Sequence, residues 1–136
     1  MPEDNFDFAF AETENISVSA YQERLEEAEG NGGLWAYCLR IENNSGRRIR
    51  LMQKDFCITD STGKNHYEQS YGFHGELPDL EAGECFEFED TVSFSGGAAV
   101  LYGCCHAVDE SGKAFTVKLP MMQLTDGRKI NCCAFH

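Results

Sequence analysis

The residues best suited to chemistry lie in a glycine-containing stretch near the middle of this 136-residue chain. Gly72 and Gly75 enclose Phe73 and His74. Two glycines three apart allow the backbone to approach a ligand closely, and successive N–H groups in such a turn can form a concave site for an anion. A basic side chain nearby would add positive charge. The candidate binding residues are therefore Gly72, Phe73, His74, Gly75, Lys54 and Arg48.

Two other interpretations of the Gly72–Gly75 stretch stay open. The glycines can serve a turn that requires positive φ for steric reasons, or the stretch can belong to a protein-binding edge. A dinucleotide fingerprint is excluded, because that motif needs a strand before it and a helix after it. Here β-type patterns lie on both sides, and the acidic residues Glu68, Glu76 and Asp79 crowd the stretch.

Seven cysteines and four histidines raise the question of a metal site. The segments Cys104–His106 and Cys132–His136 each place two adjacent cysteines near a histidine. Zinc sites normally space their cysteines by two to four residues, whereas adjacent strand residues point to opposite faces. Strand register predicts that Cys105 faces the core and that Cys104 faces outward with His106. We therefore expect no metal site, and we interpret the cysteines as free thiols that act as small apolar groups or surface thiols.

A cluster of basic residues and the absence of catalytic motifs reduce the number of functions that the sequence allows. Four basic residues follow a turn: Arg47, Arg48, Arg50 and Lys54. We expect them at the surface. There they would either bind an acidic partner or a phosphate, or form a charged turn that contacts only solvent. The chain has no nucleophile elbow, no His-Glu-x-x-His and no Walker loop. These observations predict a non-enzymatic protein without a cofactor.

The sequence pattern predicts that the elements which position these residues are β-strands. Trp35, Tyr37, Leu39 and Ile41 alternate with polar or small residues, as expected for a strand with one buried face. Further alternating segments begin near residues 16, 49, 64, 85, 98 and 113, with turn signals between them. We read Tyr21–Glu29 as a strand end and a loop, despite its helix-forming composition, and we expect Pro120 to interrupt the last strand. The pattern predicts an all-β sandwich.

Length, charge and hydropathy limit the domain organisation, the partners and the location that we expect for the chain. We expect residues 1–13 to form a flexible acidic tail, 14–125 the sandwich domain, and 126–136 a C-terminal extension. The net charge of −12 disfavours nucleic-acid binding and suits basic partners or cations. No apolar run reaches the roughly 20 residues needed to span a bilayer, and an acidic start is unlike a signal peptide. A cytoplasmic protein without membrane attachment is the expectation.

The chain resembles an ApaG domain from about Ile16 to Leu124. The resemblance is carried by several motifs in a fixed order: Trp35-x-Tyr37-x-Leu39-x-Ile41-Glu42-Asn43, Ile58-Thr59-Asp60 with Gly63, Gly72-Phe73-His74-Gly75-Glu76-Leu77-Pro78, Ala82-Gly83-Glu84-x-Phe86-x-Phe88, Leu101-x-Gly103, Asp109-Glu110-x-Gly112, and Phe115-x-Val117-x-Leu119-Pro120. The chain departs from the family pattern at the first loop glycine (Ser70 here), at Lys54-Asp55-Phe56 in place of Arg-x-Trp, at Cys105 in place of tyrosine, and at Met122 in place of phenylalanine.

The resemblance implies an immunoglobulin- or fibronectin-III-like antiparallel β-sandwich of about seven to nine strands with no established catalytic activity. Family members act as binding domains, and the family name is tied to cobalt and magnesium resistance. We therefore predict a non-catalytic binding module that engages a protein partner through its loop face or strand edges. The alternative is binding of pyrophosphate or a nucleotide polyphosphate at Gly72–Gly75, as proposed for the family's glycine loop. A homodimer through paired strand edges is also open.

Overall fold

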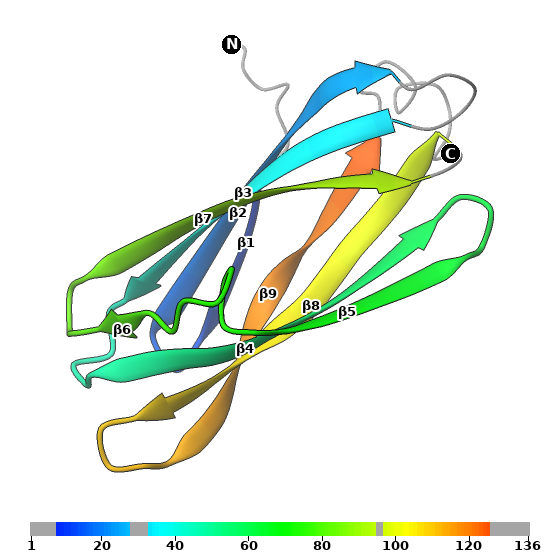
Figure 1. The fold of residues 1–136 in the computed structure, drawn as a ribbon. Coiled ribbons are helices and arrows are strands. Elements are labelled where there is room, and N and C mark those ends of the chain that lie inside the picture. Colours follow the sequence, from blue (N-terminus) through cyan, green and yellow to red (C-terminus); the bar gives the residue numbers. More distant parts are fainter. Residues whose placement is uncertain (1–7, 28–32, 95–96, 126–136) are drawn as a thin grey trace, which may run out of the picture.

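Two antiparallel sheets face each other in the computed structural model, which describes residues 8–27, 33–94 and 97–125 (Figure 1). The described residues form nine strands: β1 (Phe8–Thr13), β2 (Ile16–Glu27), β3 (Gly33–Asn43), β4 (Ile49–Asp60), β5 (Asn65–Tyr71), β6 (Asp79–Leu80), β7 (Cys85–Phe94), β8 (Ala98–Asp109) and β9 (Ala114–Thr125). The first sheet has the order β1-β2-β3-β7. The second has the order β5-β4-β8-β9, with the short β6 beside β4. The predicted all-β sandwich is confirmed, and the described ranges hold no helix long and apolar enough to cross a membrane.

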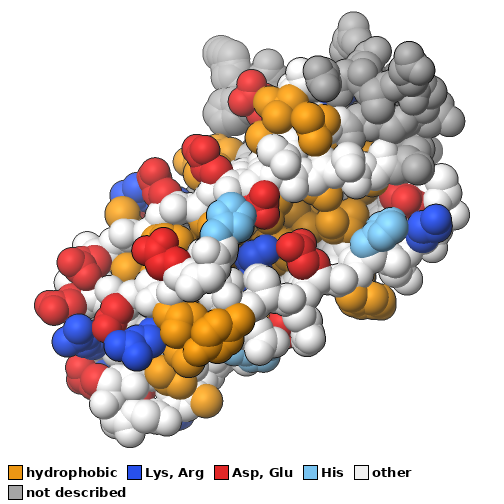
Figure 2. Space-filling view, viewed as in Figure 1, with side chains coloured by type: hydrophobic (Ala, Val, Ile, Leu, Met, Phe, Trp, Pro, Cys, Tyr) orange, Lys and Arg blue, Asp and Glu red, His pale blue; other side chains and the backbone are white. Residues whose placement is uncertain are grey.

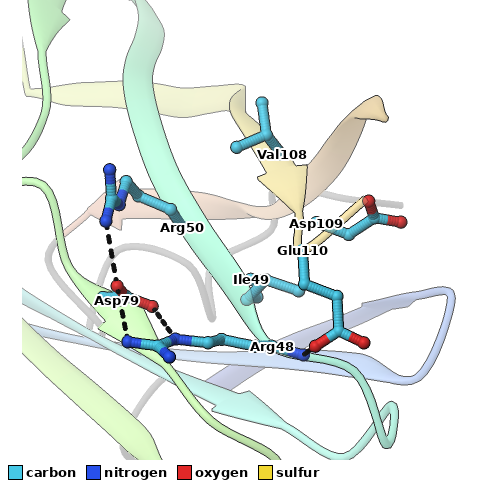
Figure 3. Close-up of a pocket in the computed structure, with 7 residues that line it drawn as sticks. All are labelled: Arg48, Ile49, Arg50, Asp79, Val108, Asp109 and Glu110. Atoms are coloured by element: carbon cyan, nitrogen blue, oxygen red, sulfur yellow. Dashed lines mark hydrogen bonds and ion pairs between the residues drawn. The ribbon is translucent and has the colours of Figure 1, made fainter. Parts of the chain in front are cut away.

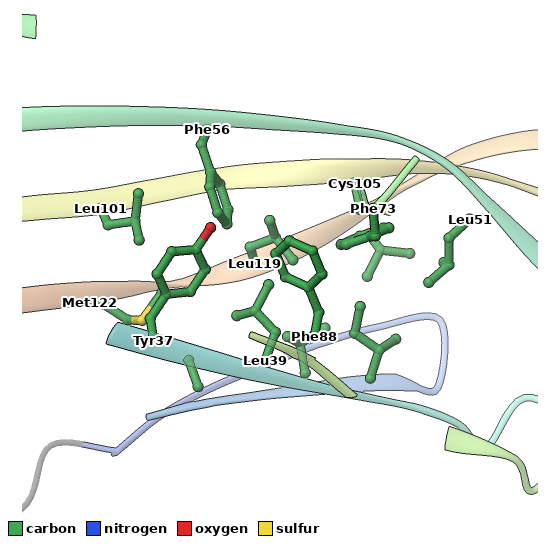
Figure 4. Packing of buried hydrophobic residues seen from close by; sticks show 14 of the residues in the cluster. Tyr37, Leu39, Leu51, Phe56, Phe73, Phe88, Leu101, Cys105, Leu119 and Met122 are labelled. Carbon is green, nitrogen blue, oxygen red and sulfur yellow. The ribbon is translucent and has the colours of Figure 1, made fainter. Parts of the chain in front are cut away.

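The core lies between the two sheets, where the alternating positions meet. Trp35 and Tyr37 of β3 face inward together with Leu39 and Ile41, as their spacing predicts. The aromatic rings from both sheets gather in the middle of this layer (Figure 4). Burial of each such side chain stabilises the fold by roughly 1.5–3 kcal/mol. Packing across the two sheets therefore holds the elements in place without a disulfide among the described cysteines.

The first strand corrects the expectation of a flexible tail over residues 1–13. Residues 8–13 form β1, which pairs with β2 in register from Phe8↔Tyr21 to Thr13↔Ile16. Glu14 and Asn15 join the two strands, and both have positive φ, at 51° and 65°. This two-residue hairpin has the type I′ pattern, which the sequence concealed because neither turn residue is a glycine. Residues 1–7 of the expected tail and the expected extension 126–136 lie outside the described residues.

A bulge in β4 corrects the expectation that Lys54 is exposed with the arginines. Leu51 pairs with Ala107 and Gln53 with His106, so Met52 has no pairing partner on β8. The extra residue shifts the phase of the strand by one. Odd-numbered residues therefore face the core before the bulge, and even-numbered ones after it. Lys54 consequently points inward, with only 2% of its surface exposed.

The last strand runs through Pro120 instead of stopping there. Met122 pairs with Leu101 and Leu119 with Gly103, so two residues of β9 oppose the single residue Tyr102 of β8. Proline has no N–H to donate to the sheet, and a bulge is a position where that donor is not required. β9 is thus one strand from Ala114 to Thr125, and the expected interruption is only a local irregularity.

Three buried polar side chains close the turns at one end of their strands. Asn43 donates from Nδ2 to the backbone oxygens of Arg47 and Leu80, at 2.6 and 3.0 Å. Asp60 and Asp109 each accept hydrogen bonds through Oδ1 from backbone N–H groups two and four residues later. Such side chains replace the missing backbone partners of a tight turn. The Asn and Asp residues that mark turns in the sequence therefore do so because their side chains form these hydrogen bonds.

The two long sides of the sandwich differ. On one side β1 lies beside β9 (Figure 1), and the N–H of Lys118 donates to Oγ1 of Thr13 at 3.0 Å. On the other side the edge strands are β5 and β7, each paired with a single neighbour within its sheet. The chain between β5 and β6 carries the glycine stretch and packs on β7. The predicted site is thus on the side where strand edges are not closed against each other.

Candidate functional site

The glycine stretch forms a tight hairpin tip between β5 and β6. Phe73 and Glu76 exchange backbone hydrogen bonds of 2.8 and 3.1 Å. Between them, His74 and Gly75 have φ of 56° and 83°, the type I′ pattern of a two-residue turn. The N–H of Gly72 donates to the carbonyl of Met52 at 2.7 Å. Three of the loop N–H groups are therefore used within the protein, and those of His74 and Gly75 have no acceptor among the described residues.

Phe73 anchors this hairpin in the core. Its side chain is 1% exposed, and its ring meets Phe86 and Phe88 of β7 edge-to-face, at centroid distances of 5.4 and 5.0 Å. His74 lies over Phe88 at 4.7 Å and places Nε2 3.3 Å from Oδ2 of Asp90. Aromatic pairs of this geometry contribute about 0.5–1.5 kcal/mol beyond their buried area. The hairpin therefore joins the second sheet to the edge strand of the first.

Lys54 reaches the same place from inside the sandwich. Its Nζ lies 4.5 Å from the ring centroid of Phe56 and 5.1 Å from that of Phe88. The nearest carboxylate oxygen is Oε2 of Glu68, at 3.9 Å. A buried ammonium needs such partners, since removing it from water is otherwise costly. Lys54 and the hairpin thus share Phe88 as a common contact.

Tyr37 contacts the same two aromatic rings as Lys54. Its ring is 5.5 Å from Phe56 and 6.3 Å from Phe88, and its side chain is 3% exposed. Burial raises the pKa of Tyr37 well above its ordinary value, and the nearby carboxylates of Asp90 and Glu68 raise it further. We call Lys54, Tyr37, Glu68, Asp90 and His74 the Lys54 cluster. Its carboxylates outnumber its permanent cation, so an anion that entered would meet both signs of charge.

Arg48 lies apart from the hairpin, in a depression of about 400 Å³ whose lining includes none of residues 72–75 (Figure 3). Its guanidinium donates to both oxygens of Asp79, at 2.9 and 3.2 Å, and Arg50 donates to the same carboxylate at 3.0 Å. These bonds lower the pKa of Asp79 and raise that of Arg48. The guanidinium groups of Arg48 and Arg50 are therefore already engaged by a carboxylate of the protein.

Comparison with known proteins identifies the family of the chain. The family model described as DUF525: ApaG domain matches residues 23–109. The chain belongs to the ApaG family. The ApaG protein of Methylocella silvestris is 29% identical over 117 residues, which cover 84% of this chain and 90% of the relative. That of Parvibaculum lavamentivorans is 32% identical over 111 residues, covering 81% and 85%.

Solved structures support the ApaG fold as well. An X-ray structure from the Northeast Structural Genomics Consortium superposes with a TM-score of 0.82 at 23% identity, covering 90% of this chain and 95% of the other. A crystal structure of a protein designated ApaA from Bordetella pertussis gives a TM-score of 0.76 at 24% identity, covering 81% and 92%. At this level of identity the likeness establishes the arrangement of the strands.

A second surface of this ApaG chain was not foreseen from the sequence. On the outer face of the second sheet, a depression of about 480 Å³ is lined by residues of β5, β4 and β8. The register places Tyr67, Cys57 and Tyr102 in one row across the three strands. Gln69, Asp55 and Cys104 form the next row on the same face.

The structure thus brings five of the six predicted binding residues together and leaves Arg48 elsewhere. Phe73, His74 and the ammonium of Lys54 meet at Phe88, which sequence reasoning placed in a strand without linking it to the loop. It also did not pair Glu68 with Lys54 or Asp90 with His74. Those contacts depend on strand pairing and on the packing of one sheet on the other, neither of which the spacing of residues along the chain specifies.

Proposed function

We propose that this ApaG chain is a non-catalytic binding module that receives an extended segment of a partner protein along β5. The observation that carries the proposal is the exposure of β5. Six of its seven residues are exposed, including Tyr67 at 77% and Tyr71 at 65%. An ordinary strand of a sandwich buries one face, whereas β5 offers both faces and its outer backbone edge.

Strand addition fits this edge. An added segment gains affinity from main-chain hydrogen bonds and specificity from alternate side chains. The neighbouring depression, with Tyr67 and Tyr102 on its rim, would receive those side chains. Glu68 and Asp55 line the same depression, and the chain carries a net charge of −12. Acidic side chains are spread over the face drawn in Figure 2. The partner segment is therefore expected to carry Lys or Arg beside apolar residues.

The other exposed edges suit this role less. β1 and β9 lie beside each other, and the hairpin tip packs on β7 through Phe73 and His74. β5 combines a free edge, exposed aromatics and an adjacent depression. Any part that the chain plays in cobalt or magnesium homeostasis would then be exercised through the bound partner.

The test is selection of displayed random peptides on the reduced full-length protein, followed by ¹⁵N NMR mapping of the selected peptides. Shifts are expected along residues 65–71 and around Tyr102. Affinity should fall at least about tenfold in Tyr67→Ala and in Glu68→Lys. Met121→Ala is the matched control, since Met121 is 61% exposed on β9. Peptides that map elsewhere, or a dimer that already occupies β5 in solution, would overturn the proposal.

A second candidate is binding of pyrophosphate or a nucleotide polyphosphate at Gly72–Gly75. It is favoured by the two loop N–H groups of His74 and Gly75 and by the ammonium of Lys54 beside the same ring of Phe88. Titration of ¹⁵N-labelled protein with pyrophosphate and with ATP, each with and without Mg²⁺, tests it. Saturable shifts confined to residues 70–76 and reduced by Gly75→Val would support the anion site. Unchanged spectra into the millimolar range would exclude it.

A further inference from the structure

Three side chains of metal-ligand type converge on the outer face of the second sheet. Asp55 lies on β4 directly opposite Cys104 of β8, and His106 follows two residues after Cys104 on the same face. Nε2 of His106 is 2.8 Å from Oδ2 of Asp55 and 3.9 Å from Sγ of Cys104. Among the described residues this is the one set of three His, Cys, Asp or Glu side chains whose ligand atoms all lie within 4.8 Å of one another.

We propose that Asp55, Cys104 and His106 form a binding site for a divalent metal ion of the zinc class. A thiolate, an imidazole and a carboxylate are the three donor types that zinc accepts, and borderline-soft ions share this preference. The expected difficulty with adjacent cysteines does not arise. Cys104 and His106 stand at positions i and i+2 of one strand and Asp55 on the neighbouring strand, whereas Cys105 faces the core and takes no part.

The distances fit such an ion. With metal–ligand bonds of about 2.0–2.3 Å in a tetrahedral arrangement, donor atoms lie roughly 3.3–3.8 Å apart. The two measured separations from Nε2, 2.8 and 3.9 Å, lie on either side of this range. Small side-chain rotations would therefore suffice. One thiolate and one carboxylate also balance the two positive charges of the ion.

A nucleophile–histidine–carboxylate relay is a poorer interpretation of the same residues. Such a relay uses both ring nitrogens, one toward the nucleophile and the other toward the carboxylate. Here both Cys104 and Asp55 face Nε2 of His106. A metal ion requires three or more donor atoms that converge on one point. A proton relay does not require such convergence.

The surroundings support the donor set and leave one position open. Nε2 of Gln53 donates to Oδ1 of Asp55 at 2.7 Å, which orients the carboxylate in the manner of an outer-shell partner. On β9 the residues opposite Cys104 and His106 are Lys118 and Thr116, neither of which is a usual zinc ligand. The side chains of Asp55 and His106 are 27% and 42% exposed. Water or an outside donor would therefore complete the coordination, as in open zinc sites.

The experiment uses Co²⁺ as a spectroscopic probe on the reduced full-length protein, followed by competition with Zn²⁺. Wild type should develop thiolate-to-cobalt charge-transfer absorption and the visible bands of four-coordinate Co²⁺, saturating at about one equivalent, and Zn²⁺ should displace them. Cys104→Ser should abolish the charge-transfer band. His106→Gln should weaken binding at least ~100-fold, because loss even of an outer-shell partner costs 10–100-fold.

Matched controls separate this site from the other thiols. Cys85→Ser removes an exposed cysteine from the other sheet, and His66→Gln removes an exposed histidine from β5. Both should bind as wild type, as should the double variant Cys132→Ser/Cys133→Ser. A band that persists in Cys104→Ser, disappears in the double variant, or never develops in wild type would overturn the proposal. Dispersed ¹⁵N spectra verify that each variant is folded, and the effect of His106→Gln decides the matter should Cys104→Ser not fold.

Discussion

Gly72 and Gly75 share a left-handed backbone but differ in the space around them, so alanine should be tolerated unequally at the two positions. At Gly75, with φ of 83°, an added Cβ meets no atom within 4 Å. At Gly72, with φ of 72°, it would lie 2.4 Å from the backbone oxygen of Glu76. That oxygen accepts the hydrogen bond that closes the hairpin, so it cannot move without opening the turn.

The magnitudes follow from these contacts. Gly75→Ala should lower the free energy of unfolding by about 1–2 kcal/mol, because its only cost is the strain of a left-handed backbone. Gly72→Ala bears the same strain and also displaces the hairpin with the buried Phe73. Losing that packing approaches the cost of truncating a core phenylalanine, about 3–5 kcal/mol. At roughly 3–5 °C per kcal/mol for a chain of this size, Tm should fall by about 3–10 °C in Gly75→Ala and by more than about 10 °C in Gly72→Ala.

Thermal unfolding followed by tryptophan fluorescence is a suitable assay, because the chain has one tryptophan and Trp35 is 5% exposed. Gly46→Ala calibrates the strain alone, since φ there is 81° and no atom lies within 4 Å of an added Cβ. Its effect should match that of Gly75→Ala. Equal destabilisation by Gly72→Ala and Gly75→Ala would refute the reasoning, because the close contact at Gly72 would then carry no energy.

Three further expectations concern protonation and thiol chemistry. The Ser111 hydroxyl, with backbone N–H groups, lowers the pKa of Asp109 to about 2, so its contribution to stability should be lost as pH falls from about 4 toward 2. Asp109→Asn should flatten that part of a urea-midpoint profile, and an unchanged profile would contradict the assignment. Burial raises the pKa of Tyr37, so stability should decline above pH ~10, and Tyr37→Phe should reduce this decline in alkaline unfolding curves. Burial raises the pKa of Cys105 to about 12, so iodoacetamide should label the exposed Cys85 before Cys105 in the native protein, as mass spectrometry of peptides can show. Early labelling of Cys105 would place it at the surface.

Alternation along the chain was sufficient to predict the class of fold and most inward-facing residues. Trp35 and Tyr37 face the core as their spacing requires, and Cys105 does so while Cys104 and His106 face outward. The strand that was expected to begin near residue 85 begins at Cys85. These features are local, because the pleat alone decides which side a residue takes.

The features that sequence reasoning missed depend on irregularities or on partners far along the chain. Lys54 faces inward because of the bulge at Met52, for which the only sequence signal was the change from odd to even apolar positions in β4. β1 escaped notice because its hairpin turn contains no glycine. Asp55 lies beside Cys104 only because β4 pairs with β8, and no motif in either segment predicts that pairing.

The bulge at Met52 has a consequence for how the chain can tolerate deletions. Removing this single residue would restore an uninterrupted ladder between β4 and β8, with Leu51 and Lys54 still facing inward and Gln53 outward. The sheet would lose nothing in register. The Met52 carbonyl, however, receives the N–H of Gly72, so the shortened chain would keep its sandwich and lose the point at which the hairpin is held. Met52 is thus dispensable to the architecture and necessary to the loop.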